Sequence, residues 1–224
     1  MNARTQTSAT LVPISCILLT LYLLAALSYW APWVDHDTAA LRLNGQDLGE
    51  FVKFLPGFGS ARGPFPRQLF YLPPFVCSLG LVLLSSSPTL VYPRWLRVGM
   101  LGVALALLPG LLPPVWGRPG ELFTSEFRLQ GIALGVGLAV VLAHAVFRQG
   151  PPVLLDAALV GLAFVALIPA QCAFWVIRPR IWAAYNTPTI RLGWGLWLHI
   201  TSWAGILITS AVLLRKAIRR HAAP

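Results

Sequence analysis

Long apolar stretches dominate this chain and restrict its fold more than any other feature. Six of them approach or exceed the roughly 20 residues that a helix needs to cross a bilayer. They cover residues 11–31, 70–91, 98–116, 130–147, 153–176 and 193–214. In lipid, backbone amide and carbonyl groups find partners only in helices and closed barrels. We therefore predict an all-α, polytopic integral membrane protein with about six transmembrane helices.

The composition favours a single transmembrane domain over residues 1–224. Charged residues make up only 11% of the chain, which excludes an ordinary soluble domain. The formal net charge of +10 is explained by arginines near the ends of the predicted spans, where they face lipid headgroups. No basic run carries the interleaved aromatic residues of a single-strand binder. Membrane lipid and other membrane proteins are therefore the expected partners, and nucleic acid is not.

The distribution of charge also predicts an orientation. If the N-terminus is cytoplasmic, the short inner segments carry Arg94, Arg97 and a basic segment that begins at Arg215, with Asp156 as the one nearby acid. The other six acids fall in segments that would face outward. This density of positive charge predicts that both termini are cytoplasmic. The preference for arginine over lysine is typical of a GC-rich genome, so we expect a multi-pass protein of a bacterial plasma (inner) membrane.

The predicted outer loop, residues 32–69, contains the pattern of a short amphipathic helix. Asp47 and Glu50 have the spacing of a capping box, which predicts a helix start at Asp47. Four apolar residues then repeat on one helix face: Leu48, Phe51, Val52 and Leu55. We expect this helix to lie on the outer surface with its apolar face down.

Asp35, His36 and Asp37 follow the first predicted span and are weak candidates for a metal site. Carboxylate oxygens and imidazole nitrogens bind metal ions. However, neighbouring residues of an extended loop point in different directions, and neither HExxH nor EF-hand spacing is present. A solvated acidic segment beside the membrane is the competing interpretation.

The fourth predicted span carries small residues at every fourth position. Gly131, Gly135, Ala139 and Ala143 share one helix face. Such a face lets two membrane helices approach closely, so that dispersion contacts hold them together. The pattern predicts a packing surface, either against another helix of this chain or against a partner subunit.

The polar residues inside the predicted spans include four candidates for a functional role: His144, Asp156, Gln171 and His199. Intramembrane ionisable groups are functional candidates by default, and a histidine pair suggests b-type haem. However, the two histidines would differ in depth by about 12 Å at 1.5 Å per residue, whereas two ligands of one iron need similar depth. Hydrogen bonds across helices are therefore the preferred interpretation.

No cofactor is predicted, although haem and a pigment-like ligand stay open. Aromatic residues gather near the outer ends of the predicted spans, which is typical of an interfacial belt. The alternative interpretation of these residues is a docking surface for another membrane protein or for a pigment-like ligand.

No motif in the sequence identifies a reaction, because Walker A, GxSxG, HExxH and the Rossmann glycine pattern are all missing. The leading hypothesis is a non-catalytic integral membrane subunit or accessory protein that docks partners through its outer face and membrane surface. The second is a small-molecule permease or the substrate-binding membrane component of a transporter. The third is an outer-face, metal-dependent membrane enzyme that uses Asp35, His36 and outer carboxylates.

Overall fold

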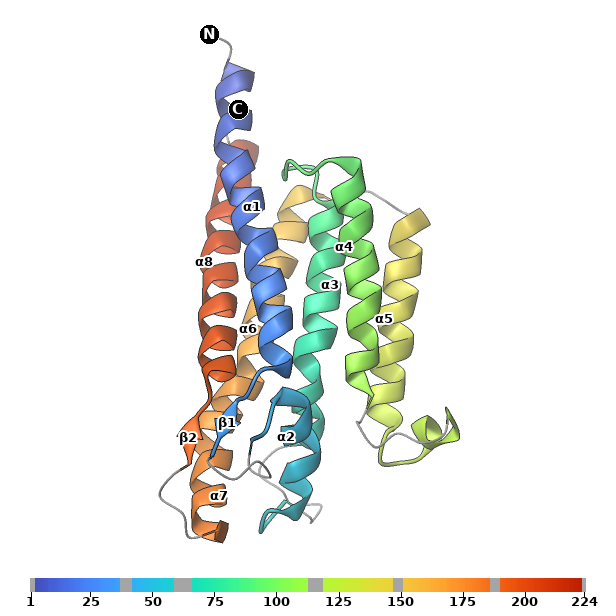
Figure 1. Ribbon diagram of the computed structural model, residues 1–224. Coiled ribbons are helices and arrows are strands. Elements are labelled where there is room, and N and C mark those ends of the chain that lie inside the picture. The colour runs from blue at the N-terminus through green and yellow to red at the C-terminus, as the bar shows by residue number, and fades with distance from the viewer. Residues whose placement is uncertain are drawn as a thin grey trace.

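The computed structural model describes residues 3–36, 42–58, 66–112, 119–146, 151–185 and 190–222, and these residues form mainly a helical bundle (Figure 1). The long helices are α1 (Ala3–Trp30), α3 (Leu72–Ser86), α4 (Arg94–Leu107), α5 (Arg128–Val146), α6 (Pro152–Cys172) and α8 (Trp194–Ala222). The mostly helical fold agrees with the all-α prediction.

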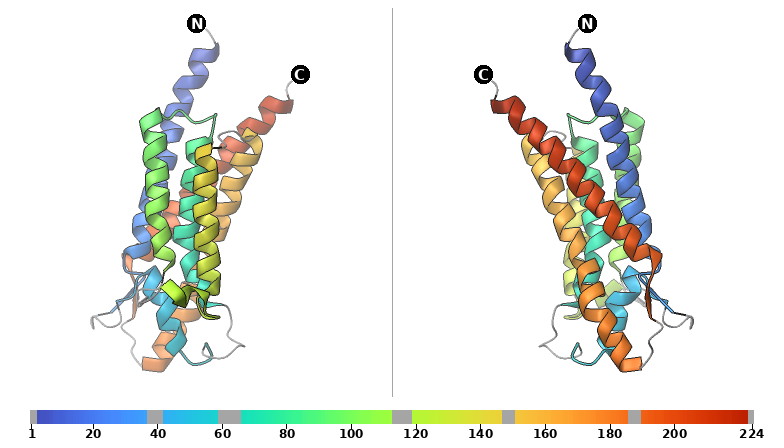
Figure 2. Two further views of the ribbon diagram at one scale, coloured as in Figure 1. Left: turned by 90° about the vertical axis from the view of Figure 1, so that its right-hand side faces the viewer. Right: turned by 90° about the vertical axis from the view of Figure 1, so that its left-hand side faces the viewer.

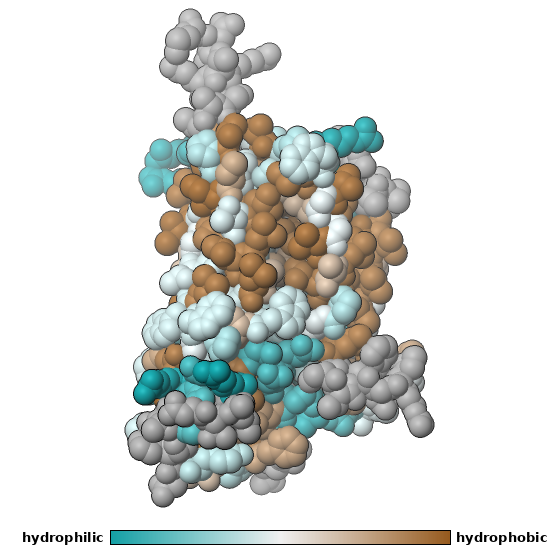
Figure 3. All heavy atoms as spheres, viewed as in Figure 1, coloured by the Kyte–Doolittle hydropathy of each residue, from teal (hydrophilic) through white to brown (hydrophobic). Residues whose placement is uncertain are grey.

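Several helices match a bilayer in length and apolar character. Within the described residues, five helical segments are long and apolar enough to cross a membrane: Leu11–Trp30, Arg67–Ser86, Arg94–Leu111, Pro152–Tyr185 and Trp194–Arg219. The apolar helix Arg128–His144 is shorter. Figure 3 shows a broad apolar band across the viewed face of the bundle, with hydrophilic residues below the band and at its upper edge. These features are compatible with a multi-pass membrane protein, and the count of six spans stays a prediction.

Helix starts and interruptions differ from the apolar stretches in the sequence. α1 begins at Ala3 rather than near residue 11, and α4 begins at Arg94 rather than near residue 98. Both helices extend into polar sequence, where hydropathy gives no signal. The 3₁₀ helix η4 (Leu108–Leu111) follows α4 and contains Pro109. Pro169 lies inside α6, and a π-helical segment, η6 (Ala173–Ile177), joins α6 to α7 (Arg178–Tyr185).

The helix α3 lies at the centre of the bundle. It contacts α1, α4, α5 and α6, whereas α8 packs mainly on α1 and α6. Figure 2 shows α4 and α5 on one side of the bundle and α8 on the other. Gly80 permits the approach of α3 to α1, because a Cβ atom there would overlap the buried ring of Tyr22.

Short elements cover the end of the bundle away from the termini. The helix α2 (Gly45–Phe51) and the 3₁₀ helices η2 (Val52–Phe54) and η3 (Arg67–Tyr71) lie there. So do the two strands β1 (Val34–Asp35) and β2 (Arg191–Leu192), which pair antiparallel. We call this region, together with α7, the capped end. We call the opposite region, where α3 and α5 end and α4 begins, the basic end.

The amphipathic helix exists, but its start and its surroundings differ from the prediction. Asn44 is the N-cap: its side chain accepts a hydrogen bond from the Asp47 amide, and the Asp47 carboxylate accepts one from the Asn44 amide. The predicted start at Asp47 is therefore wrong, because Asn44 supplies the cap three residues earlier. Leu48 and Val52 are fully buried in a cluster of this chain's own residues, so that face packs on the bundle.

Candidate functional site

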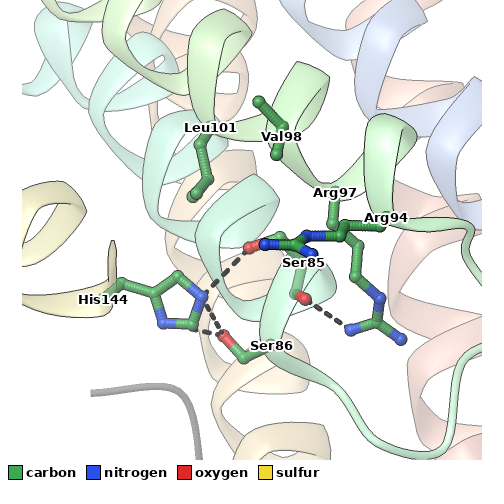
Figure 4. Close-up of a pocket in the computed structure, with 7 residues that line it drawn as sticks. All are labelled: Ser85, Ser86, Arg94, Arg97, Val98, Leu101 and His144. Atoms are coloured by element: carbon green, nitrogen blue, oxygen red, sulfur yellow. Dashed lines mark hydrogen bonds between the residues drawn. The ribbon is translucent and has the colours of Figure 1, made fainter. Parts of the chain in front are cut away.

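A polar cavity at the basic end is a candidate site for a small polar group. It has a volume of about 110 Å³ and lies between the last turn of α3, the first turns of α4 and the last turn of α5 (Figure 4). Its polar lining consists of Ser85, Ser86, Arg94, Arg97 and His144. The site therefore gathers two cations, an imidazole and two hydroxyls from three helices.

Hydrogen bonds to α3 hold His144 in this cavity. The hydroxyls of Ser85 and Ser86 donate to the Val82 carbonyl at 2.8 and 2.7 Å. Each hydroxyl oxygen also lies 3.2 Å from Nε2 of His144. Nδ1 of His144 also lies 3.2 Å from the Ser86 hydroxyl, and the tautomer of the ring determines which atom donates in each of these contacts. His144 thus links α5 to α3.

Arg97 is a structural clamp for the connection between α3 and α4. Its Nε donates to the Tyr92 carbonyl, and its two terminal nitrogens donate to the carbonyls of Ser85, Ser87 and Leu90 over 2.5–3.2 Å. These contacts make five hydrogen bonds, which equals the number of N–H groups of a guanidinium. Arg97 therefore adds positive charge to the cavity but has no N–H group left for a ligand. In the sequence, Arg97 contributed only to the prediction of which side of the membrane is cytoplasmic.

Arg94 differs from Arg97, although both line the same cavity. Its side chain is exposed, and it forms no ion pair within the described part of the chain. Of the two arginines, Arg94 alone has donors available for an anion. The cavity thus combines positive charge with few free donors, an arrangement that stabilises the helix ends more than it prepares a tight binding site.

The second predicted histidine, His199, lies in a different environment on α8. It is fully buried, with Nδ1 3.1 Å from the Ser28 hydroxyl and Nε2 3.1 Å from the Ala166 carbonyl. Its ring centroid lies 4.6 Å from that of Trp33. His199 therefore connects α8 to α1 and α6, whereas His144 connects α5 to α3. The structure does not bring the two rings to one shared set of hydrogen-bond partners.

The two other polar residues predicted inside the spans are also separate. Asp156 on α6 is buried, and its Oδ1 has no hydrogen-bond partner among the described residues. It lines a small cavity with Thr89 and Lys216. Gln171 is exposed, and its Oε1 accepts a hydrogen bond from Trp175 Nε1 at 3.1 Å. Neither residue joins the histidines in a site.

The weak metal candidates are described only in part. Asp35 accepts a hydrogen bond from Nε of Arg42 at 2.8 Å, His36 follows β1, and Asp37 lies outside the described residues. Across the described ranges, no three histidine, cysteine, aspartate or glutamate side chains gather as metal ligands would. The metal hypothesis therefore stays a prediction.

Three of the four residues in the predicted small-residue face of α5 point away from the rest of the chain. Gly135, Ala139 and Ala143 are exposed, and a Cβ atom at Gly135 would meet no atom within 4 Å. Gly131 is half-buried beside the Leu122 carbonyl. We call Gly131, Gly135, Ala139 and Ala143 the small face.

The opposite side of α5 faces the bundle. Gln130, Gly137 and Val141 are buried there, and a Cβ atom at Gly137 would lie only 2.6 Å from the Leu108 side chain. Gly137, which lies outside the predicted stripe, is therefore the α5 glycine that packs most closely within the described part of this chain, and Gly131 approaches the Leu122 carbonyl less closely.

An ionic network at the capped end joins α2, η3 and the segment before α5. Lys53 lies 2.5 Å from both Glu50 and Glu126, and Arg67 lies 2.6 Å from Glu50 and 3.0 Å from Glu126. The Tyr71 hydroxyl donates to Glu50 at 2.7 Å. The sequence suggested a capping role for Glu50, whereas the structure places it at the centre of this network.

The neighbours of Glu50 determine its protonation. Burial alone would raise the pKa of this carboxyl group, but hydrogen bonds from Lys53 and Tyr71 and the charge of Arg67 outweigh it. The net result is a pKa below the ordinary value of 4.5. Glu50 is therefore ionised at neutral pH, and the two acids and two bases of the network cancel in charge.

Comparisons with known proteins do not place this chain in a family. No family model matches the chain, and neither curated proteins nor solved structures show a significant match to it.

Proposed function

We propose that this chain is a non-catalytic integral membrane subunit or accessory protein that docks membrane partners. In this proposal the chain crosses a bacterial plasma membrane six times, because α5 spans it in addition to the five longer apolar segments, and both termini are in the cytoplasm. The exposed small face of α5 is the observation that carries the proposal, and the capped end supplies a further surface outside the membrane.

The position of α5 supports a partner rather than a neighbour within the chain. The helix lies at the edge of the bundle (Figure 1) and contacts α3, α4 and the short helices beside them. At 100° per residue, the small face lies opposite the buried Gln130, Gly137 and Val141. Close helix packing in membranes uses faces of this kind, because small side chains let the backbones approach.

The charges at the two ends support the orientation. The basic end carries Arg94 and Arg97, and α8 ends there with Arg215, Lys216 and Arg219. Six of the seven acids of the chain lie between residues 35 and 126, and Asp156 is the other. Positive charge is enriched on the cytoplasmic side of inner-membrane proteins, which favours the basic end as the cytoplasmic one.

Lengthening one side chain of the small face tests this proposal. We expect Ala139→Leu to separate the full-length chain from its partner, or from a second copy, in mild detergent, because the larger side chain holds the two helices apart. Native mass spectrometry measures the loss of the complex. Val140→Leu is the matched control, because Val140 is also exposed but lies about 100° around the helix.

Thermal unfolding of the same samples separates docking from folding. We expect both variants to unfold at the temperature of the unmodified protein, since neither position packs inside the chain. An unmodified protein that is monomeric and free of partners in mild detergent and in native-lipid particles would contradict the proposal. A complex that survives Ala139→Leu would contradict the role of the small face.

A further inference from the structure

A second cavity lies between η3, α3, η4 and α5, near the capped end. Its volume is about 240 Å³, and its lining includes Leu69, Tyr71, Phe75, Leu111, Gln130 and Ala133. A cavity of about 150 Å³ is large enough to bind benzene. This one therefore has room for a ring or a short hydrocarbon segment together with a small head group.

Gln130 is the unusual group in this wall. The residue is only 2% exposed, and neither Nε2 nor Oε1 has a hydrogen-bond partner in the described part of the chain. A side-chain amide has two N–H donors and an oxygen that accepts. Buried polar groups are nearly always paired, and an unpaired one lowers stability. The amide of Gln130, whose nitrogen and oxygen are both buried in the cavity wall, is therefore left with unused donor and acceptor capacity.

The other polar side chains that line the cavity do not pair with this amide. The Tyr71 hydroxyl donates to Glu50 at 2.7 Å. Gln68, the other glutamine of the lining, forms no hydrogen bond with Gln130. A buried water molecule usually needs two to four polar partners, whereas leucine, phenylalanine and alanine side chains form much of this wall. An amphipathic molecule suits the cavity better than water does.

We propose that this cavity binds a lipid-phase molecule with an apolar body and a neutral head group that both donates and accepts a hydrogen bond, such as a primary amide or a protonated carboxylic acid. The Gln130 side chain turns toward the cavity and pairs its amide with this head group through two hydrogen bonds, and the apolar body lies against Phe75 and Leu111. The site does not depend on partner docking, because the small face lies on the opposite side of α5.

Binding of decanamide to the purified full-length chain tests the site. Decanamide has the head group that Gln130 requires, whereas N,N-dimethyldecanamide has the same chain and carbonyl but no N–H donor. We expect decanamide to bind about tenfold more tightly, as expected for the loss of one or two neutral hydrogen bonds. The readouts are the shift in unfolding temperature and the bound mass in native mass spectrometry. Equal affinities, or no binding of decanamide, would overturn the proposal.

Two substitutions assign the binding to this cavity. Gln130→Leu removes both the donor and the acceptor and should abolish the preference for decanamide, while Gln68→Leu changes another lining residue and should retain it. If Gln130→Leu does not fold, Ala133→Leu fills the cavity from the next turn of α5 and should block decanamide. A preference that persists in Gln130→Leu, or in a folded Ala133→Leu variant, would overturn the assignment.

Discussion

The two ends of the bundle pair their charged groups in different ways. At the basic end, Arg97 donates all its N–H groups to backbone carbonyls, so its charge has no carboxylate partner there. At the capped end, Lys53 and Arg67 pair with Glu50 and Glu126. Both arrangements hold a connecting segment in place, but only the first leaves a net positive charge.

This difference shows how one bundle can present two unlike faces without extra domains. A carbonyl clamp satisfies hydrogen bonds and retains charge, which suits an end that faces anionic headgroups. A balanced network removes net charge and fixes a short helix over the bundle. An arginine thus acts in two ways, as a hydrogen-bond donor and as a positive charge. Substitutions at the two ends can test each role separately.

The largest effect is expected where the clamp is broken. Arg97→Ala removes five hydrogen bonds and leaves the carbonyls of Ser85, Ser87, Leu90 and Tyr92 without their partner. We expect the free energy of unfolding to fall by roughly 3 kcal/mol, given the strength of hydrogen bonds to charged groups. Chemical denaturation of the detergent-solubilised protein measures this change.

Arg94→Ala is the control for this prediction, because it removes the same charge from the same turn of α4. The Arg94 side chain is exposed and forms no ion pair within the described ranges. Its loss should change stability by less than about 0.5 kcal/mol. Equal effects of the two substitutions would show that charge, rather than the carbonyl contacts, determines the stability of this end.

A smaller effect is expected when the network at the capped end loses its central charge. Glu50→Gln keeps the shape of the side chain but leaves Arg67 and Lys53 with one carboxylate between them. The side chains of Glu50 and Arg67 are only 15% and 12% exposed, so we expect a loss of roughly 2 kcal/mol. Thermal unfolding of the two proteins at neutral pH measures it.

Asp35→Asn provides the matched comparison at the same end. Asp35 also pairs with an arginine, but its side chain is 37% exposed and that of Arg42 is 62% exposed. Exposed ion pairs contribute little, and the loss should stay below about 0.5 kcal/mol. A similar cost for both substitutions would mean that burial does not distinguish the two pairs.

The sequence predicted the helices well because a helix of this kind depends on the residues of its own segment. A membrane helix requires a long apolar run, and the described helices follow those runs. Their polar extensions, such as the start of α4 at Arg94, carry no hydropathy signal. The spacing of Leu48 and Val52 indicated the apolar face of α2. The cap at Asn44 was harder to predict, because Asn44 and Gly45 form an Asn-Gly pair, which is also typical of a turn.

The candidate sites depend on contacts that local spacing does not encode. Glu50, Arg67 and Glu126 meet across 17 and 59 residues of sequence. The stripe on α5 was visible as a pattern, but only the structure shows that Gly135 points outward and Gly137 inward. Gln130 was overlooked as an ordinary span end. Its spacing of seven residues from Gly137 was the available signal, since this places both residues on one face.

The smallest expected effect is a pH dependence confined to the capped end. Because the pKa of Glu50 is held below 4.5 in the folded state, its ionised form contributes stability above the unfolded pKa, and this contribution is lost as the pH falls through the folded value. The difference in unfolding temperature between the unmodified protein and Glu50→Gln should therefore be constant near neutral pH and shrink below about pH 4.5. The corresponding difference for Arg97→Ala should not follow this course, since its partners are carbonyls that do not titrate. A Glu50→Gln difference that persists unchanged well below pH 4 would show that shape and hydrogen bonding, rather than the charge of Glu50, stabilise the network.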